Sequence, residues 1–248
     1  MDLGLTGKRA IVIGASKGLG AAIAQELVDE GAHVLGVSRS PQDAEWASFA
    51  ADLSAPGAAQ AIANHAKSEL GGVDILVNNC GGPPPSAARD TDAAQISAMI
   101  QPMLLTITEL TRLVLPEMQA AKFGRIVTVS SAGVREPIPG LALSNTLRAA
   151  VHGWMKTLAR EVAADGVTVN MIMPGQIDTD RLRSLHGATA ERMGIDPAAM
   201  TAMATESIPT GRIGEPREFG AVAAFLASER ASYLTGLELP VDGGMLRS

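Results

Sequence analysis

Short apolar runs alternate along this chain with longer segments of helical periodicity. The apolar runs, bounded by turn residues, predict strands at residues 9–13, 33–38, 47–53, 74–78, 125–130, 168–173 and 237–241. A helical repeat of apolar positions predicts helices at 19–30, 58–70, 92–121, 141–164 and 216–227. Pro102 and Pro116 are expected to interrupt the third of these helices. Residues 175–214 show no clear period, and we expect them to be irregular.

Continuous apolar strands separated by helices are typical of a parallel sheet that is covered on both faces. Right-handed crossovers between such strands lead to a doubly wound (Rossmann) α/β fold, here with seven strands. No linker, internal repeat or low-complexity tail divides the chain. We therefore expect one dinucleotide-binding domain over residues 1–248, with a substrate-loop region at about 176–214.

Charge and composition exclude several classes of partner. The formal net charge is −6, so nucleic acid is not an expected partner. No apolar run approaches the ~18 residues of a membrane span, so no membrane association is expected. Cys80 is the only cysteine, which rules out an internal disulfide and favours a reducing, cytoplasmic location. No metal site is expected.

A glycine-rich turn, Gly14-Ala15-Ser16-Lys17-Gly18-Leu19-Gly20, follows the first predicted strand and opens the first predicted helix. Glycines permit a tight turn, and the helix N-terminus offers backbone N–H groups to a pyrophosphate. In this strand–turn–helix context the motif predicts dinucleotide binding, with a purely structural turn as the alternative.

The residues after the second predicted strand indicate which dinucleotide is bound. An NAD site usually carries an acid there for the ribose 2′-hydroxyl, but this chain has Ser38-Arg39 and no acid nearby. Arg39 and Lys17 could instead hold a 2′-phosphate, which favours NADP(H) over NAD. The alternative is that Arg39 is simply a solvated surface residue.

Further motifs occur in order along the chain. The chain has the glycine spacing GxxxGxG, then Asn78-Asn79-Cys80-Gly81, Ser130-Ser131, Pro174-Gly175 with Thr179, and Val241-Asp242-Gly243-Gly244. Together they resemble the short-chain dehydrogenase/reductase family over essentially all 248 residues. The similarity is greatest to bacterial 3-oxoacyl-acyl-carrier-protein reductases and a divergent subgroup related to them.

The resemblance implies roles for particular residues of this chain. It implies a cofactor site made by Gly14, Ser16, Lys17, Gly18, Leu19, Gly20, Arg39, Asp52, Leu53, Asn79, Gly81, Arg148, Pro174, Gly175, Ile177 and Thr179. Asp52 and Leu53 would meet the adenine ring, although Asp52 could instead cap the next turn. The resemblance also implies a small-molecule carbonyl or acyl substrate. It further implies a homotetramer built through helices around 103–121 and 144–163.

The catalytic set that the family uses is only partly present. The family pairs a serine, a proton-donating tyrosine, a lysine and an asparagine. Ser131 matches the serine, but Ser144, Arg148 and Met103 stand at the other three positions. A serine hydroxyl is shorter and far less acidic than a phenol, whose pKa is about 10. The only tyrosine, Tyr233, lies far along the chain.

Two functions remain open on this basis. One is an NADP(H)-dependent oxidoreductase in which Ser131 polarises a carbonyl, while Ser144 and a water, positioned by Arg148, complete proton transfer. The other is a non-catalytic NADP(H)-binding scaffold, sensor or partner subunit. His152 shares a helix face with Ser144 and Arg148, but a packing role is the better interpretation.

Two further segments, the loop beside the expected nicotinamide and the methionine-rich stretch before the last helix, can each be interpreted in two ways. The loop Gly81-Gly82-Pro83-Pro84-Pro85 forms either a rigid wall of the pocket or a stiffened surface loop. The methionines at 193, 200 and 203 either line a substrate lid or fill gaps in the core.

Overall fold

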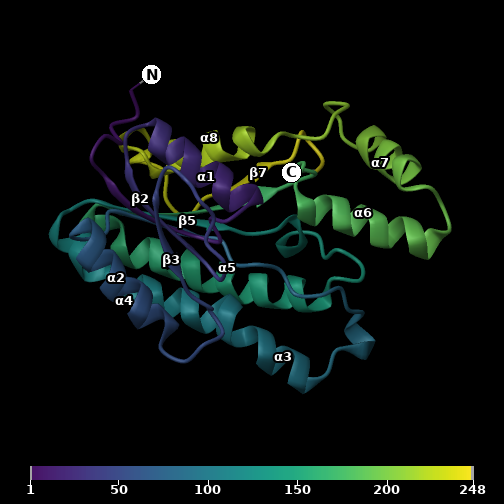
Figure 1. Ribbon diagram of the computed structural model, residues 1–248, viewed down its shortest axis with the longest axis horizontal. Helices are drawn as coiled ribbons and strands as arrows, with labels where there is room; N and C mark the ends of the chain where they lie inside the picture. The colour runs from purple at the N-terminus through teal and green to yellow at the C-terminus, as the bar shows by residue number, and fades with distance from the viewer. Residues whose placement is uncertain (1, 247–248) are drawn as a thin grey trace.

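A computed structural model, which describes residues 2–246, shows one parallel sheet between two layers of helices (Figure 1). The sheet has seven strands in the order β3-β2-β1-β4-β5-β6-β7, and every neighbouring pair is parallel. The strands are β1 (Arg9–Ile13), β2 (His33–Ser38), β3 (Ala47–Ala50), β4 (Ile75–Asn78), β5 (Gly124–Val129), β6 (Val167–Pro174) and β7 (Glu238–Val241). The predicted doubly wound fold is confirmed.

The helices divide between the two faces of the sheet. In chain order they are α1 (Gly18–Asp29), α2 (Ala58–Leu70), α3 (Ala93–Ile100), α4 (Thr106–Ala120), α5 (Ala142–Val162), α6 (Asp180–Met193), α7 (Pro197–Glu206) and α8 (Pro216–Ala227). Short turns are η1 (Ala88–Asp90), η2 (Gln101–Leu105), η3 (Ala132–Val134), η4 (Ala163–Asp165) and η5 (Glu229–Ala231). Helices α1 and α8 lie together on one face, and α2, α4 and α5 cover the other (Figure 1).

Two aliphatic cores follow from this layering, because each central strand is buried on both faces. Ile11 and Leu76 point into the core beneath α2, α4 and α5. Val12 and Ile75 point into the core beneath α1 and α8, which also contains Phe219. Successive residues of a strand face opposite sides, so continuous apolar runs are what a doubly covered sheet requires.

The connection between β2 and β3 contains no helix. Residues 39–46 join these two parallel strands through bends and extended chain alone. Such crossovers usually take a dozen or more residues and include a helix. The outer part of the sheet is instead covered by Trp46, which packs with the core beneath α1 and α8.

Residues 175–214 are not irregular, and that prediction was wrong. They contain α6 and α7, which extend from one end of the sheet (Figure 1). Their faces are largely exposed, so a helical repeat of apolar positions does not reveal them. Capping residues do mark them: Thr179 begins α6 by accepting a hydrogen bond from the Leu182 N–H, and Asp196 begins α7.

The two prolines expected to interrupt the 92–121 helix leave the chain helical. Pro102 lies in η2, a π-helical turn that joins α3 to α4, and Pro116 lies on the exposed side of α4. The continuous stretch Ala93–Ala120 has the length and mean hydropathy, 1.3, of a membrane span. Core helices of other proteins pass the same test, and here α4 contacts α2 and β5.

Candidate functional site

The carboxyl ends of β1, β4, β5 and β6 bring the sequence motifs to one edge of the sheet. Open parallel sheets bind ligands outside the carboxyl ends of their strands, at the point where the strand order reverses. In this sheet that point lies between β1 and β4. Gly14 follows β1, Asn79 follows β4, Ser131 lies two residues beyond β5, and Gly175 follows β6. The structure thus brings together motifs that are as much as 161 residues apart in the sequence, from Gly14 to Gly175.

The glycine turn after β1 has the close contacts that require glycine. A Cβ on Gly20 would lie closer than 3.0 Å to the Gly14 carbonyl oxygen and to the Asn79 side-chain nitrogen. Gly14 and Gly18 adopt φ of 72° and 58°, which favour glycine. Asn79 therefore packs directly on this turn.

The residues of the turn fit a dinucleotide pyrophosphate. Lys17 stands at the N-cap of α1 without a side-chain hydrogen bond to the helix, so the first backbone N–H groups of α1 remain available to an anion. Ser16 and Gly18 flank that position, and Leu19 packs beside the core beneath α1 and α8. Together, the cradle and the available donors match what a pyrophosphate needs.

The two cations expected at a 2′-phosphate have other neighbours. The Lys17 ammonium pairs with Asp180 at 3.5 Å, at the start of α6. Arg39 is exposed and lies near enough to Asp52 to help lower its pKa. The larger causes of that lowered pKa are hydrogen bonds from the Ser54 N–H and hydroxyl. Asp52 therefore makes the turn-capping contact that its alternative reading foresaw.

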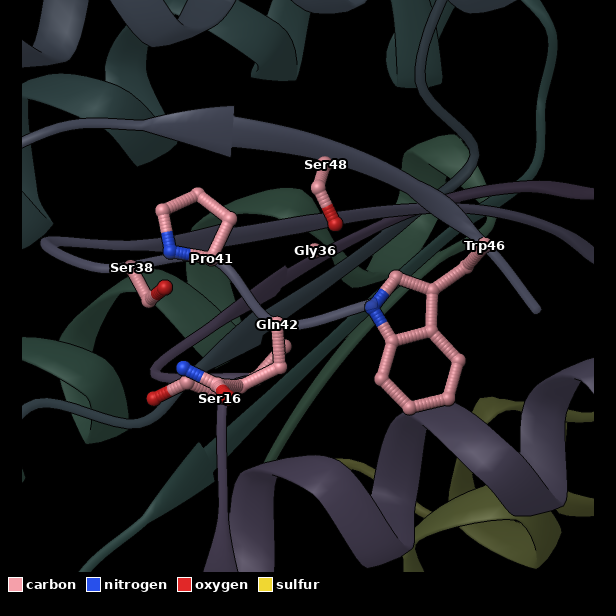
Figure 2. A pocket seen from close by; sticks show the side chains of 8 residues that line it. Ser16, Gly36, Ser38, Pro41, Gln42, Trp46 and Ser48 are labelled. Carbon is pink, nitrogen blue, oxygen red and sulfur yellow. The ribbon is translucent and has the colours of Figure 1, made fainter. Parts of the chain in front are cut away.

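A small hollow lies between the turn after β1 and the ends of β2 and β3 (Figure 2). Its lining residues are Ala15, Ser16, Gly36, Ser38, Pro41, Gln42, Trp46 and Ser48. No charged side chain is among them. Sequence reasoning missed Trp46 here, although a glycine inside a strand, Gly36, is a signal of close approach by another group.

Ser131 lies at the end of β5 with its hydroxyl oxygen accepting a hydrogen bond from the Gly133 N–H at 3.1 Å. This bond fixes the oxygen and leaves the hydroxyl hydrogen available to donate. Ser144 is on the first turn of α5 and is 8% exposed. The two serines stand on adjoining elements, since α5 contacts η3, whose N-cap is Ser131.

Arg148 follows Ser144 by one turn of α5, and main-chain oxygens hold its guanidinium. Nη1 donates to the Val129 carbonyl at 2.7 Å, and Nη2 donates to the Cys80 carbonyl at 3.4 Å. Arg148 therefore connects the carboxyl ends of β5 and β4. Cys80 itself is buried, as a small packed residue would be.

The position of the family asparagine is apolar and closed. Met103, which stands there, is 1% exposed and packs in the core beneath α2, α4 and α5. Nearby on β4, Asn78 donates from Nδ2 to the Thr111 hydroxyl at 3.4 Å. The buried Asn78 side-chain oxygen has no partner among residues 2–246.

His152 is engaged elsewhere. Its Nε2 contacts the Glu238 carboxylate, which also faces Lys156 at 3.4 Å and Arg135 at 3.5 Å. Burial raises the pKa of Glu238, but the bonds from His152 and Lys156 outweigh it, and the pKa is lowered. Tyr233 is fully exposed, in the turn before β7. These contacts support the packing interpretation of His152.

Helix α6 begins at the edge of the site. A Cβ on Gly18 would lie 3.5 Å from the Thr179 methyl, so α6 begins beside the start of α1. Arg181 donates to the Pro83 carbonyl at 3.0 Å and thereby ties α6 to the proline-rich loop. Pro83 is buried, so this loop is more than a free surface segment.

The remaining nicotinamide-side residues form a continuous wall. Pro174 ends β6 opposite Val241, and a Cβ on Gly175 would lie closer than 3.0 Å to Asp242. Ile177 is 6% exposed and bridges to Gly214. This wall meets the start of α6 at Thr179.

Met193 lies at the end of α6 and Met203 lies on α7, and each is 51% exposed. That exposure argues against the core-filling alternative for these two side chains. Within residues 2–246, no three His, Cys, Asp or Glu side chains are grouped so that they could hold a metal ion.

Comparison with known sequences matches this arrangement. A family model described as enoyl-(acyl carrier protein) reductase matches residues 14–246. The 3-oxoacyl-[acyl-carrier-protein] reductase FabG of Vibrio cholerae is 36% identical, over 98% of this chain and 99% of its own. The oxidoreductase UcpA of Escherichia coli is 34% identical, over 97% of this chain and 95% of its own.

Solved structures agree. L-sorbose reductase from Gluconobacter frateurii, determined with NADPH and L-sorbose, superposes with a TM-score of 0.91, at 30% identity and with full coverage of both chains. YwfH, an NADPH-dependent reductase involved in bacilysin biosynthesis, also has a TM-score of 0.91, at 28% identity, covering 97% of this chain and 99% of its own. This chain belongs to the short-chain dehydrogenase/reductase family.

Proposed function

We propose that the protein is an NADP(H)-dependent reductase of small-molecule carbonyl or acyl compounds, working with an altered catalytic set. The observation that carries this proposal is the intact glycine cradle at the same edge of the sheet as the Ser131 hydroxyl. Similarity to reductases supports it, since YwfH is an NADPH-dependent reductase and the L-sorbose reductase structure contains NADPH. When bound, the nicotinamide supplies a hydride to the substrate.

Ser131 is the residue assigned to polarise the substrate oxygen. Its oxygen is held by the Gly133 N–H, so its hydrogen can donate without reorganisation of the site. Ser144 is too short to reach as far as a tyrosine, so a water held by its hydroxyl completes the proton path. Arg148 positions Ser131 and Ser144 indirectly. It lies on the same helix as Ser144, and it holds the end of β5 that leads to Ser131.

The test begins with cofactor affinity and continues with turnover. We expect tight NADPH binding by calorimetry and NADPH oxidation with some members of a panel of ketones, aldehydes and 3-oxoacyl thioesters. Ser131→Ala should lower turnover by about 10²-fold, the value of one transition-state donor, without weakening NADPH binding. Ser68→Ala, at an exposed site on α2, is the matched control and should change neither. Tight binding without turnover on the whole panel would overturn the enzyme assignment.

A non-catalytic NADP(H)-binding scaffold, sensor or partner subunit is the second candidate. The observation that favours it is the guanidinium of Arg148, whose contacts are main-chain carbonyls. The double variant Ser144→Tyr/Arg148→Lys separates the two. Reductase activity that appears only in the variant supports the non-catalytic function, and an active parent refutes it. Absence of NADP(H) binding to the parent would remove the sensor form.

We further propose a homotetramer that uses the outer faces of α4 and α5. Leu105, just before α4, is 45% exposed, and α5 exposes the small residues Ala149, Ala150 and Gly153. Small side chains let helices of two copies approach closely. Light scattering is expected to give four times the 25.5 kDa chain mass, and a monomer would refute the assembly.

A further inference from the structure

The hollow of Figure 2 lacks the charges that a 2′-phosphate site was expected to use. Lys17 pairs with Asp180, and Arg39 lies near Asp52; neither lines the hollow. Its polar lining consists of serine hydroxyls, the Gln42 amide and the indole of Trp46. All of these are neutral, and all can donate a hydrogen bond.

Trp46 is the most firmly placed donor of the set. Its indole fills the space that a side chain at position 36 would occupy: a Cβ on Gly36 would lie 2.7 Å from Trp46 Cδ1 and closer still to Nε1. The next residues enter β3, where Ser48 stands opposite Gly36 on β2. The Gln25 amide also holds the preceding Glu45 at 3.2 Å. The indole is thus fixed from both sides.

The indole N–H has no acceptor of its own. Figure 2 shows the nitrogen on the side of the ring that faces Gln42 and the hollow. No hydrogen bond joins it to any group among residues 2–246. An indole nitrogen is a donor only, so the vacant partner must be an acceptor.

The size of the hollow restricts that acceptor. Its volume is about 10 Å³, which is room for one water molecule or one oxygen atom of a larger group. The hollow lies at the ends of β2 and β3, where a dinucleotide carries its adenosine ribose. A 2′-phosphate on that ribose can extend one oxygen into the hollow. The 2′-hydroxyl of NAD is shorter and does not extend as far.

We propose that Trp46 determines NADP specificity, its indole N–H binding one oxygen of the 2′-phosphate together with the serine hydroxyls of the hollow. The proposal rests on the proposed function, since it assumes that the cradle after β1 binds a dinucleotide. According to this proposal, neutral donors in fixed positions bind the adenosine end of the cofactor. Lys17 then remains available to hold α6 through Asp180.

The experiment measures dissociation constants of NADPH and NADH by calorimetry for the wild type and Trp46→Phe. Phenylalanine keeps the aromatic ring over Gly36 and removes the N–H. A hydrogen bond to a charged group is expected to make about a tenfold or larger difference. We expect Trp46→Phe to weaken NADPH by that factor and to leave NADH within twofold.

Two further variants test the same geometry. Trp154→Phe removes the only other tryptophan, on α5, and should leave both affinities unchanged. In that variant, emission from Trp46 alone should be quenched by NADPH at the same midpoint that calorimetry gives. In Gly36→Ala the added Cβ would displace the indole without changing Trp46 itself. This variant should also lose affinity for NADPH but not for NADH.

The outcomes separate the inference from the proposed function. An equal loss of NADPH and NADH affinity in Trp46→Phe, or no loss of either, overturns the role of the indole while cofactor binding stands. Wild-type protein that binds neither dinucleotide overturns the proposed function and the inference with it. Thermal melting of each variant shows whether a loss of affinity is a loss of fold.

Discussion

Removing the Arg148 guanidinium should destabilise the protein before any cofactor is added. The structure gives Arg148 one short bond to a main-chain oxygen, from Nη1 to Val129, and one long bond to Cys80. The short bond to a charged donor is worth roughly 1.5–3 kcal/mol, and the bond at 3.4 Å adds little. For a chain of this size each kcal/mol corresponds to roughly 2–4 °C in Tm. Arg148→Ala should therefore melt about 3–12 °C lower.

Scanning calorimetry of the apo protein measures this shift. Arg148→Lys should fall between the wild type and Arg148→Ala, because one ammonium can donate to one of the two carbonyls but cannot connect both strand ends. Arg160→Ala is the matched control, since Arg160 is exposed on the same helix and should change Tm by no more than a surface substitution does.

A different result would refute the reasoning from these bonds. If Arg148→Ala melts like the wild type but binds NADPH much more weakly, Arg148 acts on the cofactor and not on β4 and β5. The indirect role assigned to it in positioning Ser131 would then fall.

Two further outcomes follow from the contacts of single residues. Gly20→Ala should weaken NADPH binding more than tenfold, because its Cβ meets the Gly14 carbonyl, whereas Gly187→Ala on α6, with nothing within 4 Å, should bind normally; equal affinities by calorimetry would contradict this. Burial raises the pKa of Asp74, but three hydrogen bonds from Arg9 more than compensate and lower it. Its stabilising effect is therefore complete above about pH 5 and is lost as the pH falls through the lowered folded-state pKa. Denaturant unfolding of Asp74→Asn should show lower stability at pH 7 and a flatter decline below pH 5, and curves parallel to the wild type would show that the ion pair contributes nothing.

Most of the fold was predictable because the central strands are buried on both faces. Continuous apolar runs between glycine-rich turns, such as those of β1 and β2, are typical of strands that are buried on both faces. Helices α6 and α7 were missed because they bury little, as the exposure of Met193 and Met203 shows. Their capping residues were in the sequence, but capping alone is a weaker signal than periodicity.

The candidate site, like the fold, could be predicted from the sequence only in part. The glycine turn is readable because only glycine tolerates its contacts and its positive φ values. The contacts of Arg148 were not readable, because their acceptors are main-chain carbonyls that every residue carries. Lys17 pairs with Asp180, which lies on α6, a helix without a clear apolar period in the sequence.

The helix-free crossover at residues 39–46 has a consequence for engineering. Eight consecutive residues, with few bonds to the rest of the chain, carry Pro41, Gln42 and Trp46, three of the groups that line the hollow. In a crossover with a helix, replacing such groups would also disturb the packing of that helix against the sheet. Here the segment can be exchanged as one cassette between the ends of β2 and β3, so that Trp46, the donor assigned to the 2′-phosphate, is added or removed by a single short graft while the serines of the hollow stay in place.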